Sequence, residues 1–203
     1  VNKPSERDPS VPMRLAELMM EAGLPEGVLN VVNGDKEAVD ALIEDPRVKA
    51  ISFVGSSDIA QYIYANGAAH NKRVQAFGGA KNHLIILPDA DMENVVNQLI
   101  GSGYGSAGER CMATPVAVPV GEKTAETLVS MLKPRVESLR IGPSMSEDSD
   151  LGPLVTAAHK KRVEGYIQMA IDEGQTPVVD GRGFTLQGYE KGFFLGGTLL
   201  DHA

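Results

Sequence analysis

The stretch GYGSAGERCMA, residues 103–113, contains the single cysteine of the chain, Cys111, beside residue types that cysteine chemistry uses. A thiolate is a strong nucleophile, and a neighbouring cation favours the thiolate over the thiol. Arg110 supplies such a cation and could also hold an anionic group of a substrate. The glycines before it keep backbone N–H groups accessible, as an oxyanion site requires. The stretch therefore predicts a nucleophilic Cys111; the alternative is a small buried hydrophobe, the commoner role of a lone cysteine.

The same stretch contains a G-x-G-x-x-G string, which runs from Gly103 to Gly108. In dinucleotide-binding proteins this string follows a strand and opens a helix. Here it follows DMENVVNQLI (91–100), an amphipathic segment with acidic residues at its start, for which we predict a helix. Because that context differs from the dinucleotide fingerprint, we expect these glycines to let the backbone turn tightly beside a substrate instead.

The segment FVGSS (53–57) lies where a predicted strand ends and a predicted helix begins. Helix N-termini attract phosphate groups, Gly55 permits a close approach, and Ser56 offers a hydroxyl. The segment therefore predicts a phosphate site, although an ordinary strand–turn–helix connection would use the same residues.

The segment KPSER (3–7) combines hydrogen-bond donors with an acceptor. Lys3 and Arg7 are the donors, and the carboxylate of Glu6 could accept hydrogen bonds from ribose hydroxyls. The alternative is a solvated loop ahead of the first helix.

Composition excludes several classes of function for the 203-residue chain. Its formal net charge of −8 argues against nucleic acid or an anionic membrane as the main partner. No apolar run approaches the roughly 20 residues of a membrane span, and the polar start VNKPSERDPS is unlike a signal peptide. A single cysteine permits no internal disulfide, which favours a reducing, cytoplasmic setting. We expect no metal site, because no histidine has close metal-ligand spacing with Cys111.

Hydrophobic periodicity predicts strands and helices that alternate along the chain, and hence an α/β fold with a parallel sheet covered on both faces. We expect Ser10 to cap the first helix, Thr156 to cap the last, and Pro134 to bend or split the helix that contains it. The expected helices cover residues 10–22, 36–45, 57–69, 91–100, 123–139 and 156–174. The expected strands lie within 28–32, 48–55, 73–79, 83–91, 113–120, 176–179 and 192–200, with a Gly-Gly turn at residues 78–79.

Four of these segments, in this order and with these separations, resemble the aldehyde dehydrogenase superfamily: KPSE, FVGSS, GGAKNH and GSAGERCMA. The resemblance is strongest to its CoA-acylating semialdehyde branch, on GAKNH, GYGSAGERCMA, DLGPLVT and GYEKGFFLGGTLLD. It covers essentially the whole chain. It implies part of a Rossmann-like NAD-binding domain over residues 1–78, followed by an α/β catalytic domain of the aldehyde dehydrogenase fold over residues 79–203.

The resemblance implies a role for each candidate residue. Cys111 would attack the aldehyde, hydride would pass to NAD, and a thioacyl enzyme would remain, with the Cys111 N–H stabilising the oxyanion. Arg110 would pair with the carboxylate of a semialdehyde substrate. The NAD contacts would fall on Lys3, Glu6 and Arg7 at the adenine ribose, Gly55 and Ser56 at the pyrophosphate, and Gly78 near the nicotinamide.

At Ala76 this sequence differs from the hydrolytic members of the family. Hydrolytic members carry a glutamate at the matching position, where it activates water, and alanine cannot act as a base. The acyl group would therefore wait for coenzyme A, so that methylmalonate or malonate semialdehyde would yield propionyl-CoA or acetyl-CoA after loss of CO2. The alternatives are a hydrolytic enzyme with another base and a non-catalytic module that binds a nucleotide or an acyl group.

The resemblance also implies that the chain is a piece of a longer protein. Family residues for the oxyanion, the first nucleotide-binding strands, the nicotinamide ribose and the oligomerisation strand would lie outside residues 1–203. We therefore expect this piece to be inactive by itself and the complete protein to be a homo-oligomer, either a dimer or a tetramer.

Overall fold

The computed structural model describes residues 1–202, and the chain divides into two compact units. Unit 1 is Val1–Gly79, and unit 2 begins at Ala80 and contains the rest of the chain. Both units combine helices with parallel strand pairs, which confirms the α/β class.

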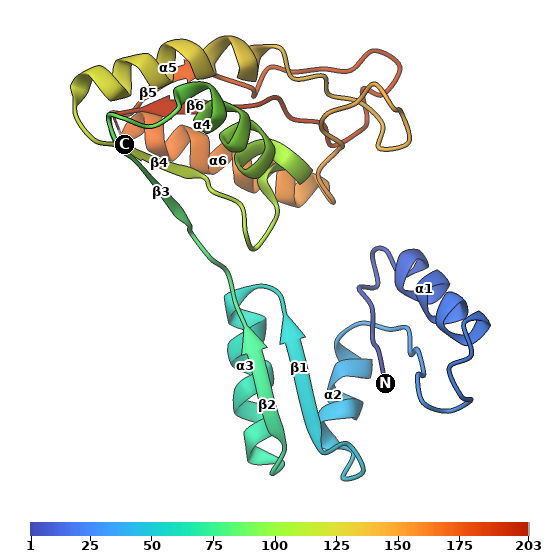
Figure 1. Ribbon diagram of the computed structural model, residues 1–203. Helices are drawn as coiled ribbons and strands as arrows, with labels where there is room; N and C mark the ends of the chain where they lie inside the picture. The colour runs from blue at the N-terminus through green and yellow to red at the C-terminus, as the bar shows by residue number, and fades with distance from the viewer. Residues whose placement is uncertain (203) are drawn as a thin grey trace. The chain divides into compact units, whose positions relative to one another are not determined.

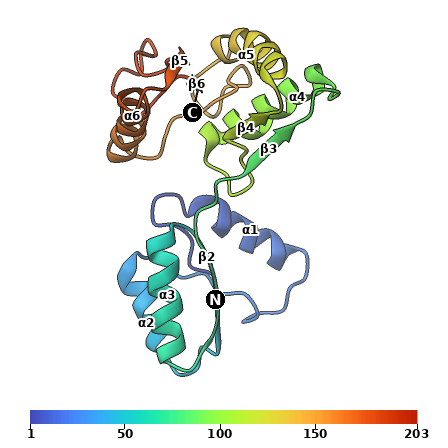
Figure 2. The same ribbon diagram turned by 90° about the vertical axis from the view of Figure 1, so that its left-hand side faces the viewer.

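Unit 1 is built around a strand–helix–strand motif (Figure 1). Strands β1 (Ala50–Val54) and β2 (Arg73–Phe77) pair in parallel, and α3 (Ser57–Ala69) connects them. Gly67 lets α3 approach the strands, because a Cβ atom there would lie 2.6 Å from Val74 Cγ2. The other two helices of unit 1 are α1 (Ser10–Glu21) and α2 (Lys36–Glu44), and α2 lies beside α3 (Figure 2).

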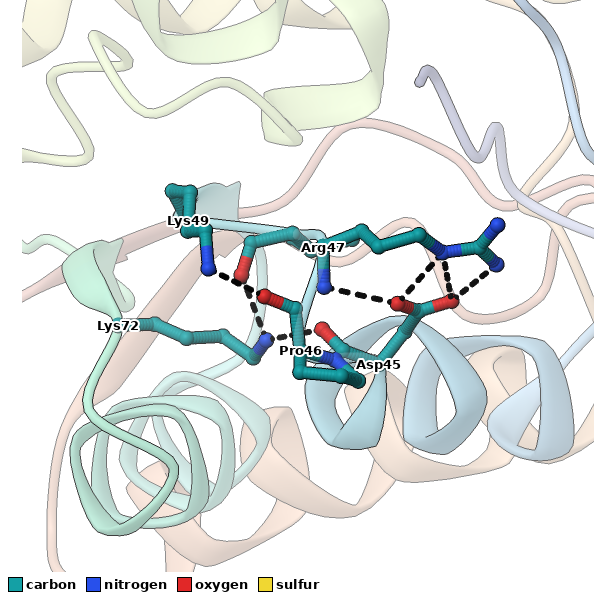
Figure 3. Close-up of polar contacts among 6 residues, drawn as sticks. Asp45, Pro46, Arg47, Lys49 and Lys72 are labelled. Carbon is teal, nitrogen blue, oxygen red and sulfur yellow. Dashed lines mark hydrogen bonds and ion pairs between the residues drawn. The ribbon is translucent and has the colours of Figure 1, made fainter.

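The turn between α2 and β1 encloses a buried ammonium group, as Figure 3 shows. Lys72 is only 8% exposed, and its Nζ donates hydrogen bonds to the carbonyl oxygens of Asp45 (2.6 Å) and Val48 (2.7 Å). On the outside of the same turn, hydrogen bonds from the Arg47 guanidinium hold the pKa of the Asp45 carboxyl well below its usual range. The turn is therefore fixed from both sides by cations.

Unit 2 is organised around one apolar core. Parallel strands β3 (His83–Ile86) and β4 (Val116–Pro119) pair beside α4 (Met92–Leu99) and α5 (Glu122–Glu137). The remaining elements are α6 (Ala157–Asp172) and the antiparallel pair β5 (Thr176–Val179) and β6 (Leu199–Asp201). Side chains from β3, α4 and α5 form the buried cluster: Ile86, Val96, Leu99, Leu128, Leu132 and Val136.

The expectation of buried strands covered on both faces is wrong for unit 1. Its sheet has two strands, and only alternate side chains of each strand are half-buried, among them Ile51 and Val74 near α3. The outward residues Val54 and Phe77 are 63% and 54% exposed. The pattern is therefore that of a sheet with one covered face.

The strand expected over residues 28–32 is also wrong. Only Val31 makes a ladder contact, an isolated bridge to Asn2, so the segment is otherwise irregular. Strand β6 begins later than expected, at Leu199, because the preceding chain makes a different close contact. A Cβ atom at Gly181 would lie 2.1 Å from the Gly196 carbonyl oxygen, and Gly196 N–H donates to Gly181 O at 2.9 Å.

The expected cap of α1 is wrong, and so is the expectation that Pro134 splits its helix. Pro9, not Ser10, is the N-cap of α1, since the Ser10 hydroxyl donates to Asp8 Oδ1 instead (2.6 Å). Helix α5 continues through Pro134, which removes one N–H donor, while the Ser138 N–H still bonds the Pro134 carbonyl at 3.1 Å. The expected cap of α6 is confirmed, because the Thr156 side chain accepts from the His159 N–H.

None of the described helices combines the length and apolar character that crossing a membrane would require.

Lys72→Met should lower the free energy of unfolding of unit 1 by about 1–3 kcal/mol, because two carbonyl groups lose a charged donor. Lys49→Met is the matched control. The ammonium group of Lys49 also bonds a carbonyl of this turn, that of Pro46 at 2.6 Å, but it lies in solvent. Hydrogen exchange of α2 and α3 in denaturant measures both effects, and equal losses would contradict the role assigned to Lys72.

Candidate active site

Cys111 lies in a tight turn that follows α4, which we call the cysteine turn, residues 105–113. Helix α4 runs into a π-helical turn, Ile100–Tyr104, and then into a short 3₁₀ turn, Gly105–Gly108. Ser106 and Ala107 have φ angles of 55° and 54°, in the left-handed region that side chains disfavour. The G-x-G-x-x-G string thus follows helical backbone and opens no long helix, as the sequence context predicted.

The thiol of Cys111 is exposed, so the alternative of a buried hydrophobe is wrong. The backbone around it is held by Asn82, from the segment before β3. Asn82 Nδ2 donates to the carbonyl oxygens of Cys111 (2.9 Å) and Ala113 (2.8 Å). One amide group therefore anchors the downstream half of the cysteine turn.

Two further contacts fix the base of the turn. The Tyr104 hydroxyl donates to the Thr198 carbonyl oxygen at 3.0 Å, and burial raises the pKa of this phenol. The hydroxyls of Ser102 and Thr114 are hydrogen-bonded to each other. The two ends of the loop are therefore tied together ahead of and behind Cys111.

The charged neighbours of Cys111 take different partners. The Arg110 guanidinium lies over Gly105, where a Cβ atom would be 3.0 Å from Nη1. Within residues 1–202, no carboxylate forms an ion pair with Arg110, which leaves its charge available to an anion. Glu109 instead pairs with His159 Nε2, on the first turn of α6.

Unit 1 contains the predicted phosphate segment at the N-terminus of α3. Ser56 is the N-cap residue, and its hydroxyl makes no capping hydrogen bond. Gly78 comes close to the same turn, because a Cβ atom there would lie 2.7 Å from Ser57 Oγ and 2.9 Å from Ser57 Cα. The Ser57 hydroxyl accepts from the Gly79 N–H at 3.0 Å, and the Gly55 N–H bonds the Phe77 carbonyl oxygen at 3.1 Å.

These features fit the pyrophosphate of a dinucleotide. A 13-residue helix presents its first N–H groups and an unused hydroxyl, and Gly78 leaves the adjoining backbone without a side chain. The carboxylate of Asp58 also lies in the first turn, so a bound anion would have to approach on the side of Ser56.

The residues predicted to contact the adenine ribose, Lys3, Glu6 and Arg7, already have partners within the fold. Lys3 Nζ donates to the carbonyl oxygens of Gly34 (2.7 Å) and Pro4, so two of its donors are used within the fold. Glu6 and Arg7 form an exposed ion pair at 3.6 Å. Across the described part of the chain, no hydrogen bond or ion pair joins this segment to residues 53–57.

Asn82 and His159 are site residues that the sequence analysis did not single out. Asn82 lies in GGAKNH, which carried the family resemblance without giving Asn82 a role, and its partners are 29 and 31 residues away. His159 was recognisable only as a residue three positions beyond a predicted cap. Within residues 1–202, no cluster of histidine, cysteine and carboxylate side chains is arranged to bind a metal.

An exposed cysteine in a glycine-rich turn of one unit, and a helix N-terminus suited to a phosphate group in the other, are features expected of a class of nucleotide-dependent enzymes with a thiol nucleophile. The family comparison is consistent with this class and more specific. The aldehyde dehydrogenase family model matches residues 1–203, and the chain belongs to that family.

Curated relatives include malonate-semialdehyde dehydrogenases from Pseudomonas aeruginosa, 59% identical over 98% of this chain, and from Halalkalibacterium halodurans, 52% identical over all of it. The chain spans about 40% of the length of these relatives (40% and 41%).

Solved structures share the fold. A Sinorhizobium meliloti protein, assigned as a methylmalonate-semialdehyde dehydrogenase and complexed with NAD, is 62% identical with a TM-score of 0.94, over 98% of this chain and 40% of its own. Methylmalonate-semialdehyde dehydrogenase from Oceanimonas doudoroffii is 57% identical with a TM-score of 0.95, over 99% and 41%. These matches confirm the resemblance found in the sequence.

Asn82→Ala should lower the free energy of unfolding of unit 2 by about 1–2 kcal/mol, because two carbonyl groups lose their shared donor. Asn82→Asp should cost more, since a carboxylate would face both carbonyl oxygens. Asn97→Ala, an exposed change on α4, is the control. Denaturant unfolding measures all three, and an Asn82→Asp chain as stable as the parent would refute the anchor.

Cys111 should react with iodoacetamide in the native chain at neutral pH, since its thiol is exposed. Mass spectrometry would find one added carbamidomethyl group, and Cys111→Ser would remove it. Reaction only after addition of denaturant would contradict the exposed position.

Proposed function

We propose that this chain is the part of a CoA-acylating (methyl)malonate-semialdehyde dehydrogenase that supplies the nucleophile and some of the NAD contacts. The observation that carries the proposal is the exposed thiol of Cys111 in a strained turn, beside Arg110, which forms no ion pair within residues 1–202. Malonate-semialdehyde dehydrogenases among the relatives support the substrate class.

In this proposal Cys111 forms the covalent bond to substrate. Its thiolate attacks the aldehyde carbon, and the Cys111 N–H stabilises the resulting oxyanion. NAD would be held by unit 1 and would supply the hydride acceptor, so that loss of hydride from the thiohemiacetal carbon would leave a thioester on Cys111. Arg110 holds the substrate carboxylate, and its lack of a carboxylate partner in the described residues leaves it free to do so.

We assign NAD binding to residues of unit 1. Ser56 would bind the pyrophosphate at the N-terminus of α3, beside Gly55, whose N–H already bonds the Phe77 carbonyl oxygen, and Gly78 would lie near the nicotinamide. At the adenine ribose, Glu6 would accept hydrogen bonds from hydroxyls, with Lys3 and Arg7 as donors. The third Lys3 donor is the one available, since two already bond carbonyl oxygens.

Ala76 determines the fate of the acyl group. It lies in β2, opposite Phe53 in the ladder, and its methyl side chain cannot take a proton from water. The β-carboxylate of the acyl group leaves as CO2, and the carbon takes up a proton. The thiol of coenzyme A then loses its proton and attacks the thioester, so that Cys111 leaves as a thiolate. The products are propionyl-CoA or acetyl-CoA.

We further propose that the complete protein is a cytoplasmic homo-oligomer, a dimer or a tetramer. The single cysteine and the absence of a membrane-spanning helix among residues 1–202 agree with that location.

The test uses the full-length parent with malonate semialdehyde and NAD, with and without coenzyme A. Steady NADH formation should require coenzyme A, and its omission should leave a single burst, because the acyl-Cys111 bond persists. Equal turnover without coenzyme A would reject the acylating assignment in favour of a hydrolytic enzyme.

Ala76→Glu in the same parent should create turnover that is independent of coenzyme A, because a carboxylate can then activate water. Ala76→Gln, which has the same size and no basic group, should not. If Cys111→Ala still forms NADH, the covalent mechanism fails and a non-catalytic role for this cysteine stands.

A further inference from the structure

We propose that Glu109 and His159 are a positioning pair that holds the cysteine turn against α6 and so fixes where Cys111 is presented. That the position of Cys111 matters for catalysis rests on the proposed function. The contact between Glu109 and His159 does not, because it is part of the fold. The two residues are 50 positions apart and both belong to unit 2.

The turn needs an upstream anchor because its own backbone is unfavourable. Three consecutive residues, Ser106, Ala107 and Gly108, have positive φ angles, and two of them carry side chains. Such backbone persists only where surrounding contacts determine it. Inside the turn, the Glu109 N–H bonds the Ser106 carbonyl oxygen at 3.0 Å, a local contact that cannot fix the turn relative to the rest of unit 2.

The backbone of His159 is held in place at the start of α6. The Thr156 side chain accepts from the His159 N–H at 3.1 Å, so the backbone of this residue is fixed by the cap of a 16-residue helix. The N-terminal end of that helix also favours a carboxylate such as Glu109. The two side chains are only 33% and 34% exposed, which shields the pair from solvent more than a surface salt bridge.

The pair complements the Asn82 anchor. Asn82 holds the carbonyl groups of Cys111 and Ala113 on the downstream side, and Glu109 is attached two residues before the thiol. Cys111 therefore lies between two side-chain contacts that reach different parts of unit 2, the segment before β3 and helix α6. Loss of either should release the turn without unfolding the core, which is formed by β3, α4 and α5.

Hydrogen exchange of the chain, followed by mass spectrometry of peptides over residues 103–113, tests the pair. Glu109→Ala and His159→Ala should each raise exchange there about threefold to fivefold, with exchange in α5 unchanged. Glu164→Ala is the matched control: this carboxylate pairs with Lys160 on the same helix at 3.9 Å and is equally exposed at 33%, but it does not reach the turn.

Two further variants separate positioning from a merely structural effect. Glu109→Gln keeps an acceptor for His159 Nε2–H and should restore exchange close to that of the unaltered chain. The double variant Glu109→Ala/His159→Ala should exchange no faster than either single variant, because both remove one interaction.

Unchanged exchange in Glu109→Ala, additive effects in the double variant, or the same increase with Glu164→Ala would each overturn the pair. None of these readouts uses enzymatic activity. Failure of the proposed dehydrogenase function would therefore leave this test unaffected, and failure of the pair would leave the proposed chemistry intact.

Discussion

The left-handed backbone of Ser106 and Ala107 is the constraint on which the candidate active site depends. This conformation is sterically strained for residues with a Cβ atom, so other contacts must stabilise it. The observed contacts do this from several directions: Asn82 bonds the following carbonyl groups, Tyr104 ties the preceding helical turn to Thr198, and Ser102 ties it to Thr114 just after the cysteine turn. An exposed thiol at a fixed backbone position is the result.

The two units provide different kinds of recognition. Unit 1 offers helix-end N–H groups, a free hydroxyl and glycine backbone, which suit a phosphate chain without distinguishing one nucleotide from another. Unit 2 offers a thiol and an unpaired guanidinium within the described residues, which suit an electrophile that carries an anion. In the proposed enzyme, substrate selectivity therefore depends mainly on unit 2.

Local patterns in the sequence predicted most helices and strands, and α3 begins and ends where expected because the end of the preceding strand and the helical periodicity agree there. The strand predicted over residues 28–32 was wrong because β-branched composition cannot supply a pairing partner. A split at Pro134 was wrong because a helix with a buried face tolerates one lost hydrogen bond. The exposed Cys111, the candidate nucleophile, could be proposed from adjacent residues. Its supports, Asn82 and His159, were not, since each acts through contacts about 30 to 50 residues away.

The exposure of Cys111 has a consequence for the redox chemistry of the protein. Oxidation of an accessible thiolate first gives a sulfenic acid, which a second thiol can reduce by way of a disulfide. This chain contains no second cysteine, so that rescue must come from a thiol outside it, such as a small-molecule reductant. The reductant supply around the protein, rather than its folding stability, would then set how long the nucleophile stays usable.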